Sequence, residues 1–223
     1  MKIFFALAAL GGQFQAPFVT SLFQLLPVLE RNKIGTAMST ISFPDIEVAR
    51  NYLVTTFFDL KPDCTHMLII DADMGFSPQL IGDMISLDVD VAGVAYPRKG
   101  IAKGGGLSFI HGELDRSEER NGFVRTDACG TGVMLIKRET IARMVETLPE
   151  IVDETRFRAS PFADRFERFL TPFTKIRLED RELSTDYSFC RRWVEGCGGE
   201  VWINTKHKVA HTGPFDFTGA LDG

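Results

Sequence analysis

Two carboxylates one residue apart, Asp71 and Asp73, are the side chains of this sequence best suited to chemistry. They follow the apolar run Met67 to Ile70, which is typical of a short strand buried on both faces. Residues i and i+2 of an extended chain point to the same side, so both carboxylates can face one point beyond the strand. Hard oxygen ligands in that position suit Mg²⁺ or Mn²⁺ shared with a diphosphate. A second interpretation is that Asp71 caps a turn and Asp73 caps a helix starting near Pro78.

The composition predicts one globular domain. The chain has 223 residues, 44% of them hydrophobic and 25% charged, which is enough for a sizeable core. The formal net charge of -5 gives no general attraction to nucleic acid or to an anionic membrane. Of the 4 cysteines, Cys64, Cys129 and Cys190 lie in or beside apolar runs and are expected to be buried free thiols. A Cys190–Cys197 bridge is disfavoured if both residues lie on one helix. We therefore expect a cytoplasmic protein.

The N-terminal segment allows two interpretations. Lys2 followed by the apolar run Ile3 to Leu10 resembles the core of a signal peptide, but it is too short to cross a bilayer as a helix. Apolar residues then continue at helical spacing from Phe18 to Leu29. A first buried strand leading into an amphipathic helix explains the whole region, and we favour it. No other stretch is long enough for a bilayer, so we expect no transmembrane segment.

Strands and helices alternate along the first part of the chain. The pattern predicts strands at residues 3–9, 34–40, 66–70 and 89–94, with helices at about 17–32, 46–57 and 78–85 between them. Ser42-Phe43-Pro44-Asp45 and Ser77-Pro78 are the helix-start signals. Alternation of this kind favours an α/β fold with a mostly parallel sheet and helices on both faces.

The second part of the chain is less regular. Residues 98–122 carry Arg98, Lys99 and Lys103 around three glycines and then a charge run, so we expect an irregular excursion with a hairpin at Leu107–His111. It is either a binding loop or a solvated surface loop. Strands are expected at 124–128, 133–137, 201–204 and 209–213, and helices from Thr140 and from Ser184.

Residues 149–176 match no clear element. Phenylalanines interleave there with arginines, as in an amphipathic lid or a surface that touches a membrane or another subunit, although such aromatics more often pack on the core. The phenylalanines are Phe157, Phe162, Phe166, Phe169 and Phe173.

Several short motifs occur in an order that resembles the GT-A type glycosyltransferases, close to family 2 and especially its short bacterial and phage forms. They are Ala49-Arg50-Asn51, Thr65 to Met74, Tyr96-Pro97, Gly130 to Ile136, Ser184 to Cys190 and His211-Thr212-Gly213. Each motif is weak alone, and their order and spacing carry the resemblance. It implies a Rossmann-like GT-A domain over residues 1–223, with a nucleotide-binding half at about 1–97 and an acceptor-side half at about 98–223.

The resemblance also implies metal and nucleotide ligands. Asp71 and Asp73 would form the DxD motif, with Asp73 as the direct ligand of Mn²⁺ or Mg²⁺ and Asp71 nearer the ribose or the waters of the metal. His211 would be a further metal ligand, and an imidazole beside carboxylates suits Mn²⁺ better than Mg²⁺. Arg50 and Asn51 would lie near the nucleotide. Without the resemblance, these two residues are explained equally well as a surface ion pair and a helix-end cap.

Two further roles concern the sugar. Gly132, with Gly130, would let the backbone approach the sugar closely. Asp186 would take the place of the catalytic aspartate of inverting members, which usually follows a glutamate. Here Thr185 precedes it, so the match is incomplete. The alternative is that Asp186 or its neighbours only cap a helix.

The implied activity is metal-dependent transfer of a sugar from a nucleotide-sugar donor, with a UDP-sugar as the expected donor, to an acceptor hydroxyl. The acceptor is a glycan, a lipid, a protein or a modified nucleic acid, and the oligomeric state is open. We expect inversion at the anomeric carbon, although retaining enzymes share the fold and need no such base. Three alternatives are a sugar nucleotidyltransferase, a non-catalytic nucleotide- or sugar-binding module, and a metal-free structural subunit. Residues 11–20 lack the basic loop expected of the nucleotidyltransferase.

Overall fold

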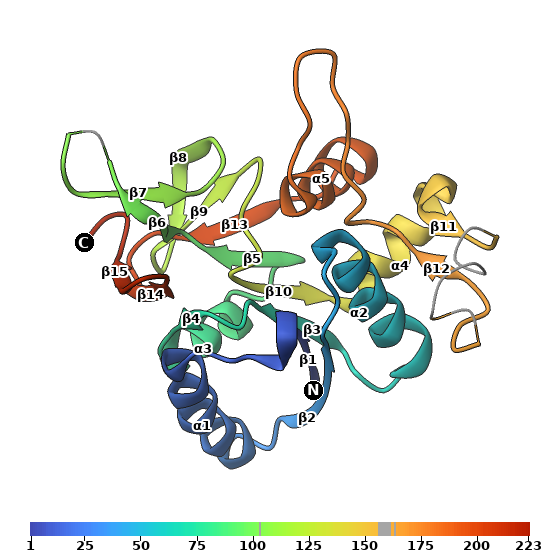
Figure 1. Ribbon diagram of the computed structural model, residues 1–223, viewed down its shortest axis with the longest axis horizontal. Helices are drawn as coiled ribbons and strands as arrows, with labels where there is room; N and C mark the ends of the chain where they lie inside the picture. The colour runs from blue at the N-terminus through green and yellow to red at the C-terminus, as the bar shows by residue number, and fades with distance from the viewer. Residues whose placement is uncertain (103, 156–161, 163) are drawn as a thin grey trace.

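The computed structural model describes residues 1–102, 104–155, 162 and 164–223 (Figure 1). Its strands are β1 (Lys2–Ala8), β2 (Gly35–Ile41), β3 (His66–Ile70), β4 (Met74–Gly75), β5 (Val91–Val94), β6 (Tyr96–Ile101), β7 (Leu107–Ile110), β8 (Leu114–Arg120), β9 (Phe123–Thr126), β10 (Val133–Lys137), β11 (Val152–Asp153), β12 (Phe169–Leu170), β13 (Val201–Asn204), β14 (Val209–Thr212) and β15 (Asp216–Gly219). Its helices are α1 (Ala16–Arg31), α2 (Ile46–Leu60), α3 (Pro78–Leu87), α4 (Arg138–Thr147) and α5 (Thr185–Arg191), which a π-helical turn, η4 (Arg192–Gly196), continues. Short 3-10 turns are η1 (Leu10–Gly12) and η2 (Pro149–Ile151).

The central sheet is mixed, and most of its strands share one direction. It has 8 strands in the order β2-β1-β3-β10-β5-β13-β9-β8. β1 pairs in parallel with β2 and β3, and β5 pairs in parallel with β13. β10 and β9 run against both of their neighbours. The predicted α/β fold with a mostly parallel sheet is therefore confirmed, and β10 adds an antiparallel strand at its centre.

Alternate side chains of the buried strands enter two hydrophobic cores. In β3, Met67 and Ile69 face one core, whereas Leu68 and Ile70 face the other. Helices α2 and α4 cover the first face, and α1 and α3 cover the second (Figure 1). Both faces of the central strands are thus buried, as their continuous apolar runs indicate.

The helix starts follow the expected capping chemistry. The Asp45 carboxylate accepts the backbone N–H groups of Glu47 at 2.8 Å and Val48 at 3.3 Å, which begins α2. The Ser77 hydroxyl accepts the N–H of Leu80 at 3.3 Å and begins α3. The interpretation of Asp73 as the cap of α3 is therefore wrong, because Ser77 fills that position.

Residues 98–122 are more regular than expected. β6 and β7 form an antiparallel hairpin that begins at Tyr96, and its register shifts between Pro97 and Ile101. The charge run is β8, which pairs with β9 at the edge of the central sheet. Charged side chains protect such an edge from pairing with another chain, and that explains why the sequence looks like a loop. Lys103 lies outside the described residues.

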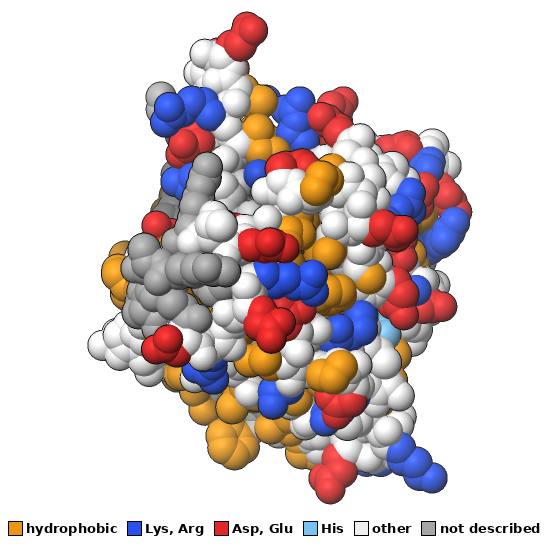
Figure 2. All heavy atoms as spheres, turned by 90° about the vertical axis from the view of Figure 1, so that its right-hand side faces the viewer, with side chains coloured by type: hydrophobic (Ala, Val, Ile, Leu, Met, Phe, Trp, Pro, Cys, Tyr) orange, Lys and Arg blue, Asp and Glu red, His pale blue; other side chains and the backbone are white. Residues whose placement is uncertain are grey.

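The aromatic residues of 149–176 pack on the core. Phe166, Phe169 and Phe173 are buried, and the ring of Phe162 lies 4.7 Å from that of Tyr52 on α2. The packing interpretation is confirmed for these residues, while Phe157 lies outside the described residues. Acidic and basic side chains interleave over this side of the molecule (Figure 2), and Arg168 pairs with Asp59 of α2 at 2.8 Å.

The N-terminal segment and the cysteines behave as predicted. β1 carries a run of buried residues and leads into α1, so the interpretation as strand and amphipathic helix is confirmed. Cys64, Cys129, Cys190 and Cys197 are all buried free thiols. Among the described helices, none combines the length and the apolar character needed to traverse a bilayer.

Candidate functional site

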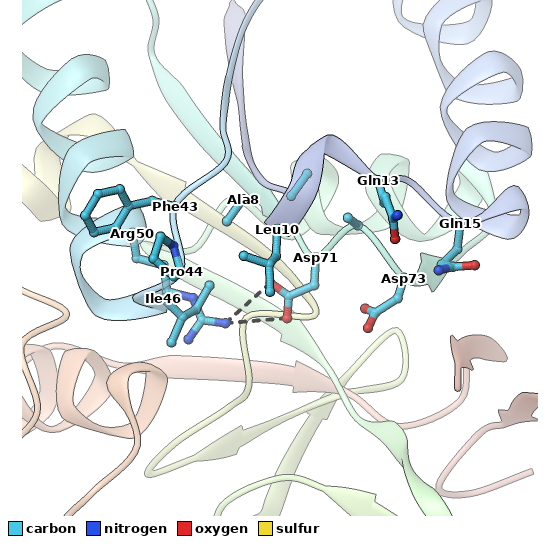
Figure 3. A pocket seen from close by; sticks show the side chains of 12 residues that line it. Ala8, Leu10, Gln13, Gln15, Phe43, Pro44, Ile46, Arg50, Asp71 and Asp73 are labelled. Atoms are coloured by element: carbon cyan, nitrogen blue, oxygen red, sulfur yellow. Dashed lines mark hydrogen bonds and ion pairs between the residues drawn. The ribbon is translucent and has the colours of Figure 1, made fainter. Parts of the chain in front are cut away.

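A cleft opens where the strand order reverses. The chain passes from β1 through α1 to β2 on one side of β1, and from β2 through α2 to β3 on its other side. Ligands of open α/β sheets bind beyond the carboxyl ends of the strands at such a point. A cleft of about 460 Å³ lies there (Figure 3). Its lining residues are Ala8, Ala9, Leu10, Gln13, Gln15, Phe43, Pro44, Ile46, Arg50, Asp71, Ala72 and Asp73.

The cleft has an apolar side and a polar side. Leu10, Pro44 and Ile46 lie near Arg50 and Asp71, whereas Gln13 and Gln15 lie toward Asp73 (Figure 3). Leu10 is 68% exposed and Ile46 is 42% exposed, so apolar surface is left open to water at the mouth. A flat, largely apolar group is the kind of ligand that would cover this surface.

Arg50 joins the residue after β3 to the start of α5. It is 8% exposed on the first half of α2. One Nη atom donates to the Asp71 carboxylate at 3.3 and 3.5 Å, and the other donates to the hydroxyl of Thr185. A buried guanidinium is stable when it is paired in this way. The structure therefore brings together residues that lie far apart in the sequence, around position 50, position 71 and position 185.

The pKa of Asp71 is raised above its ordinary value. Burial is the main cause, because it disfavours the carboxylate, and the charges of Asp73 and Asp186 add to it. The guanidinium of Arg50 opposes the rise through its charge and its hydrogen bond. Arg50 is therefore the group that counteracts the effect of burial on the pKa of Asp71.

Asp73 faces Lys99 and His211. The ammonium of Lys99, on β6, pairs with Oδ2 of Asp73. Nε2 of His211, on β14, lies 3.7 Å from the same oxygen. β14 reaches this position because His211 pairs with Met74 of β4, next to the DxD segment. Nδ1 of His211 lies 2.8 Å from the carbonyl of Pro97, which can only accept, so Nδ1 donates to it and Nε2 faces Asp73.

This arrangement fits a divalent cation. Metal-binding histidines commonly donate their second ring N–H to a backbone carbonyl, as His211 does. Oδ1 of Asp73 is buried and has no hydrogen-bond partner in the described part of the chain, so the charge of this carboxylate is only partly compensated. Among residues 1–102, 104–155, 162 and 164–223, no group of three or more His, Cys, Asp or Glu side chains is placed to hold a metal. Asp73 and His211 therefore suit a cation that takes its other ligands from a diphosphate and water.

Asp186 lies in the first turn of α5, partly exposed. Its carboxylate accepts the hydroxyl of Ser184 and the N–H of Tyr187, the latter at 3.1 Å. Burial and the charge of Asp186 raise the pKa of Tyr187 to about 12, so its hydroxyl stays protonated and donates to the carbonyl of His111. Asp186 thus helps to start the helix and also presents a carboxylate near Asp71.

Asn51 and Gly132 have partners inside the fold. The amide of Asn51 donates to Thr174 at 3.1 Å and accepts the N–H of Phe173 at 3.0 Å, so it connects α2 to the segment before α5. A Cβ at Gly132 would lie 2.7 Å from the ring of Tyr96, which fills the space beside this glycine. The roles predicted for these two residues toward nucleotide and sugar stay predictions, and the contacts seen here are structural.

The sequence analysis missed several residues of the site. Lys99 appeared only as part of a basic run, and Gln13 and Gln15 carried no signal at all. The pairing of β4 with β14 is what brings His211 to Asp73, beside Lys99, and this pairing joins distant segments. One signal in the sequence was available: side chains alternate along a strand, so Arg98 and Lys99 of β6 must point to opposite sides and only one of them can face the site.

Comparisons with known proteins identify the fold. No protein family model matches the chain. No curated protein matches it either. The crystal structure of A197 from STIV is similar at a TM-score of 0.54 and 16% identity, over 99% of this chain and 90% of that chain. The crystal structure of GalNAc-T7 with UDP, GalNAc and Mn²⁺ has a TM-score of 0.49 and 11% identity, over 95% of this chain and 43% of that chain. The crystal structure of mannose-1-phosphate geranyltransferase from Thermus thermophilus has a TM-score of 0.48 and 12% identity, over 91% of this chain and 73% of that chain. The similarity to A197 shows a shared fold.

Proposed function

We propose that this chain is a GT-A type glycosyltransferase that transfers a sugar from a nucleotide-sugar donor, with a divalent cation as cofactor. One observation carries the proposal: Arg50, Asp71, Asp73 and His211 meet at the switch point of the sheet, beside a cleft of about 460 Å³. The motif resemblance, which runs along most of the chain, supports the same activity. Membership of family 2 and a bacterial or phage origin remain predictions.

The cleft suits a nucleoside diphosphate. The nucleobase lies against the apolar side formed by Leu10, Pro44 and Ile46. Asp71 lies toward the ribose, and Asp73 with His211 would hold Mn²⁺ or Mg²⁺. When bound, that cation supplies Lewis-acid stabilisation of the charge on the leaving diphosphate. We take UDP as the expected nucleoside diphosphate.

Asp186 is the proposed general base of an inverting reaction. It accepts the proton of an acceptor hydroxyl while that oxygen attacks the anomeric carbon. The bond from this carbon to the leaving phosphate oxygen breaks, and its electron pair leaves with the nucleoside diphosphate. The position of Asp186 at the start of α5, coupled to Asp71 through charge, supports this role.

We also propose that the two halves of the chain have different roles. The cleft is built by residues before 97, so this half binds the nucleotide, and residues after 98 supply Asp186 and His211 and face the acceptor. The acceptor is a glycan, a lipid, a protein or a modified nucleic acid. A cytoplasmic location is also proposed, and the four free thiols support it.

A binding module that does not turn over its ligand is the second candidate. One observation favours it: the ammonium of Lys99 already neutralises Asp73. A module of this kind would bind a nucleoside diphosphate and release none from a donor. A nucleotidyltransferase receives less support, because Gln13 and Gln15 occupy the loop where basic residues are expected.

The decisive experiment measures release of free nucleoside diphosphate from UDP-, GDP- and dTDP-sugars, with Mn²⁺, with Mg²⁺ and with chelator. Hydrolysis by water needs no knowledge of the acceptor. We expect one donor to be turned over, and we expect chelator or Asp73→Ala to abolish the release. Asp180→Ala, on the exposed segment before α5, is the matched control and should keep the activity. Binding of a nucleotide without release from any donor would favour the module instead.

A further inference from the structure

Lys99 occupies the cation side of Asp73. Its ammonium pairs with Oδ2, the oxygen that also faces Nε2 of His211 at 3.7 Å. The lysine stem runs beside Gly213, where an added Cβ would lie 3.4 Å from Cδ and 3.5 Å from Cβ of Lys99. Lys99 therefore comes from the β6–β7 hairpin to the position that a cation shared by Asp73 and His211 would need.

The surroundings explain why a positive charge sits there. A carboxylate that is 27% exposed, with one oxygen buried and without a partner in the described part of the chain, needs a counter-charge. The ammonium of Lys99 pairs directly with Oδ2, whereas Nε2 of His211 lies 3.7 Å from that oxygen. Lys99 is therefore the closer source of counter-charge. A divalent cation on the same oxygen would repel the ammonium, so the two cannot be held there together.

We propose that Lys99 is the resident counter-ion of the Asp73–His211 site and moves to the diphosphate of the donor when the divalent cation binds. The inference rests on the proposed function. A lysine is suited to such a move, because its flexible stem carries a compact charge with three rotatable donors. The side chain of Lys99 is 37% exposed, which leaves room for it to turn. The displaced ammonium finds new negative charge on the phosphate oxygens.

The proposal predicts opposite effects on two ligands. Removing the ammonium removes the competitor of the cation, so Mn²⁺ alone should bind more tightly. It also removes a phosphate ligand, so a nucleoside diphosphate in the presence of Mn²⁺ should bind more weakly. A lysine with only a structural role would weaken both or change neither.

The experiment titrates the intact protein with Mn²⁺ alone and follows free Mn²⁺ by its electron paramagnetic resonance signal. UDP, GDP and dTDP are then titrated in turn at saturating Mn²⁺. The variants are Lys99→Met, Lys99→Arg, which keeps the charge, and Asp73→Ala. Lys33→Met is the matched control, because it removes an exposed ammonium between α1 and β2, away from Asp73. Thermal unfolding of each variant checks that it is folded.

We expect Lys99→Met to tighten Mn²⁺ binding about fivefold, the size of a partly exposed ion pair. Binding of the nucleoside diphosphate should weaken about tenfold, while Lys99→Arg and Lys33→Met stay near the wild type. Mn²⁺ affinity in Lys99→Met that equals or falls below that of the wild type would overturn the proposal. Failure of the proposed function looks different: no donor is hydrolysed, whatever the effect of Lys99→Met on Mn²⁺.

Discussion

At the scale of single residues, Arg50 lowers the pKa of Asp71 against the effect of burial. Burial raises the pKa of Asp71, and the guanidinium opposes that rise. Arg50→Met should therefore raise this pKa further, so that Asp71 takes up its proton at a higher pH. If ionised Asp71 is needed, the acid limb of the pH profile of kcat/KM for donor hydrolysis moves to higher pH. Arg192→Met is the control, because Arg192 donates to backbone carbonyls of Pro172 and Thr174 instead. An acid limb that does not move in Arg50→Met would contradict this assignment.

The role of His211 as a metal ligand can be tested by measuring the affinity for Mn²⁺. Its Nδ1 is fixed on the carbonyl of Pro97, which leaves Nε2 for the cation. His211→Gln should lower the affinity for Mn²⁺ by at least about tenfold, since it removes one of two protein ligands and the fixed orientation. His66→Gln, at the start of β3, should leave the affinity unchanged. Equal Mn²⁺ affinity in the two variants, measured by the resonance titration, would exclude His211 as a ligand.

Some of these residues could be predicted from the sequence, and others could not. Asp71 and Asp73 stand out because carboxylates after a buried apolar run are unusual. Asn51 looked similar to Arg50 in sequence, yet successive residues on a helix point in different directions, and Asn51 bonds to Phe173 and Thr174. The ion pair of Lys99 with Asp73 could not be predicted, because the two residues are distant in sequence and come together only in the folded chain.

At the scale of elements, two neighbouring threonines of α2 should differ in their contribution to the free energy of unfolding. Thr55 is fully buried, and its hydroxyl accepts the N–H of Leu170 at 2.9 Å, which ties β12 to the helix. Thr55→Val leaves that N–H without a partner and should lower the free energy of unfolding by about 2 kcal/mol. Thr56 is also buried, at 3% exposure, but its hydroxyl has no partner in the described part of the chain. Thr56→Val should be neutral or stabilising. Urea unfolding compares the two, and equal losses would contradict the argument.

The loop between β9 and β10 is fitted to one aromatic ring. A Cβ at Gly130 would meet the hydroxyl of Tyr96, whereas one at Gly132 would lie 2.7 Å from its ring carbon Cε1. Gly130→Ala and Gly132→Ala should each cost about 2 kcal/mol by overpacking. Adding Tyr96→Phe should recover part of the loss for Gly130→Ala only, because it removes the closest clashing atom and leaves the ring carbons. A double-mutant cycle measured by urea unfolding tests this, and equal recovery at both glycines would contradict it.

Elements with a strong hydrophobic pattern could be predicted well. β3 was expected at His66–Ile70, and its observed bounds agree. β8 was missed because its charges, typical of a loop, are also those of an exposed edge strand. The antiparallel insertion of β10 between β3 and β5 could not be predicted, because apolar runs that are buried on both faces carry no sign of direction.

At the scale of the whole molecule, ligand binding should stabilise the fold. The cleft and the Asp73–His211 pair draw on segments from both halves of the chain, so under the proposed function Mn²⁺ and the cognate nucleoside diphosphate should bind only the folded state. At a hundredfold excess over Kd, linkage predicts about 2.7 kcal/mol of added stability, and therefore a rise in Tm of about 5–10 °C. Asp73→Ala should abolish the part that needs Mn²⁺. An equal rise in that variant, seen by thermal unfolding, would place the cation elsewhere.

The antiparallel pairing of β14 with β4 also sets the order in which the site is made. During synthesis, Arg50, Asp71 and Asp73 leave the ribosome early, while the strand that carries His211 emerges long after them. A nascent chain that ends before β14 has Asp73 and lacks the second proposed ligand, His211. The proposed cation site would therefore be completed only once β14 has been translated and has paired with β4.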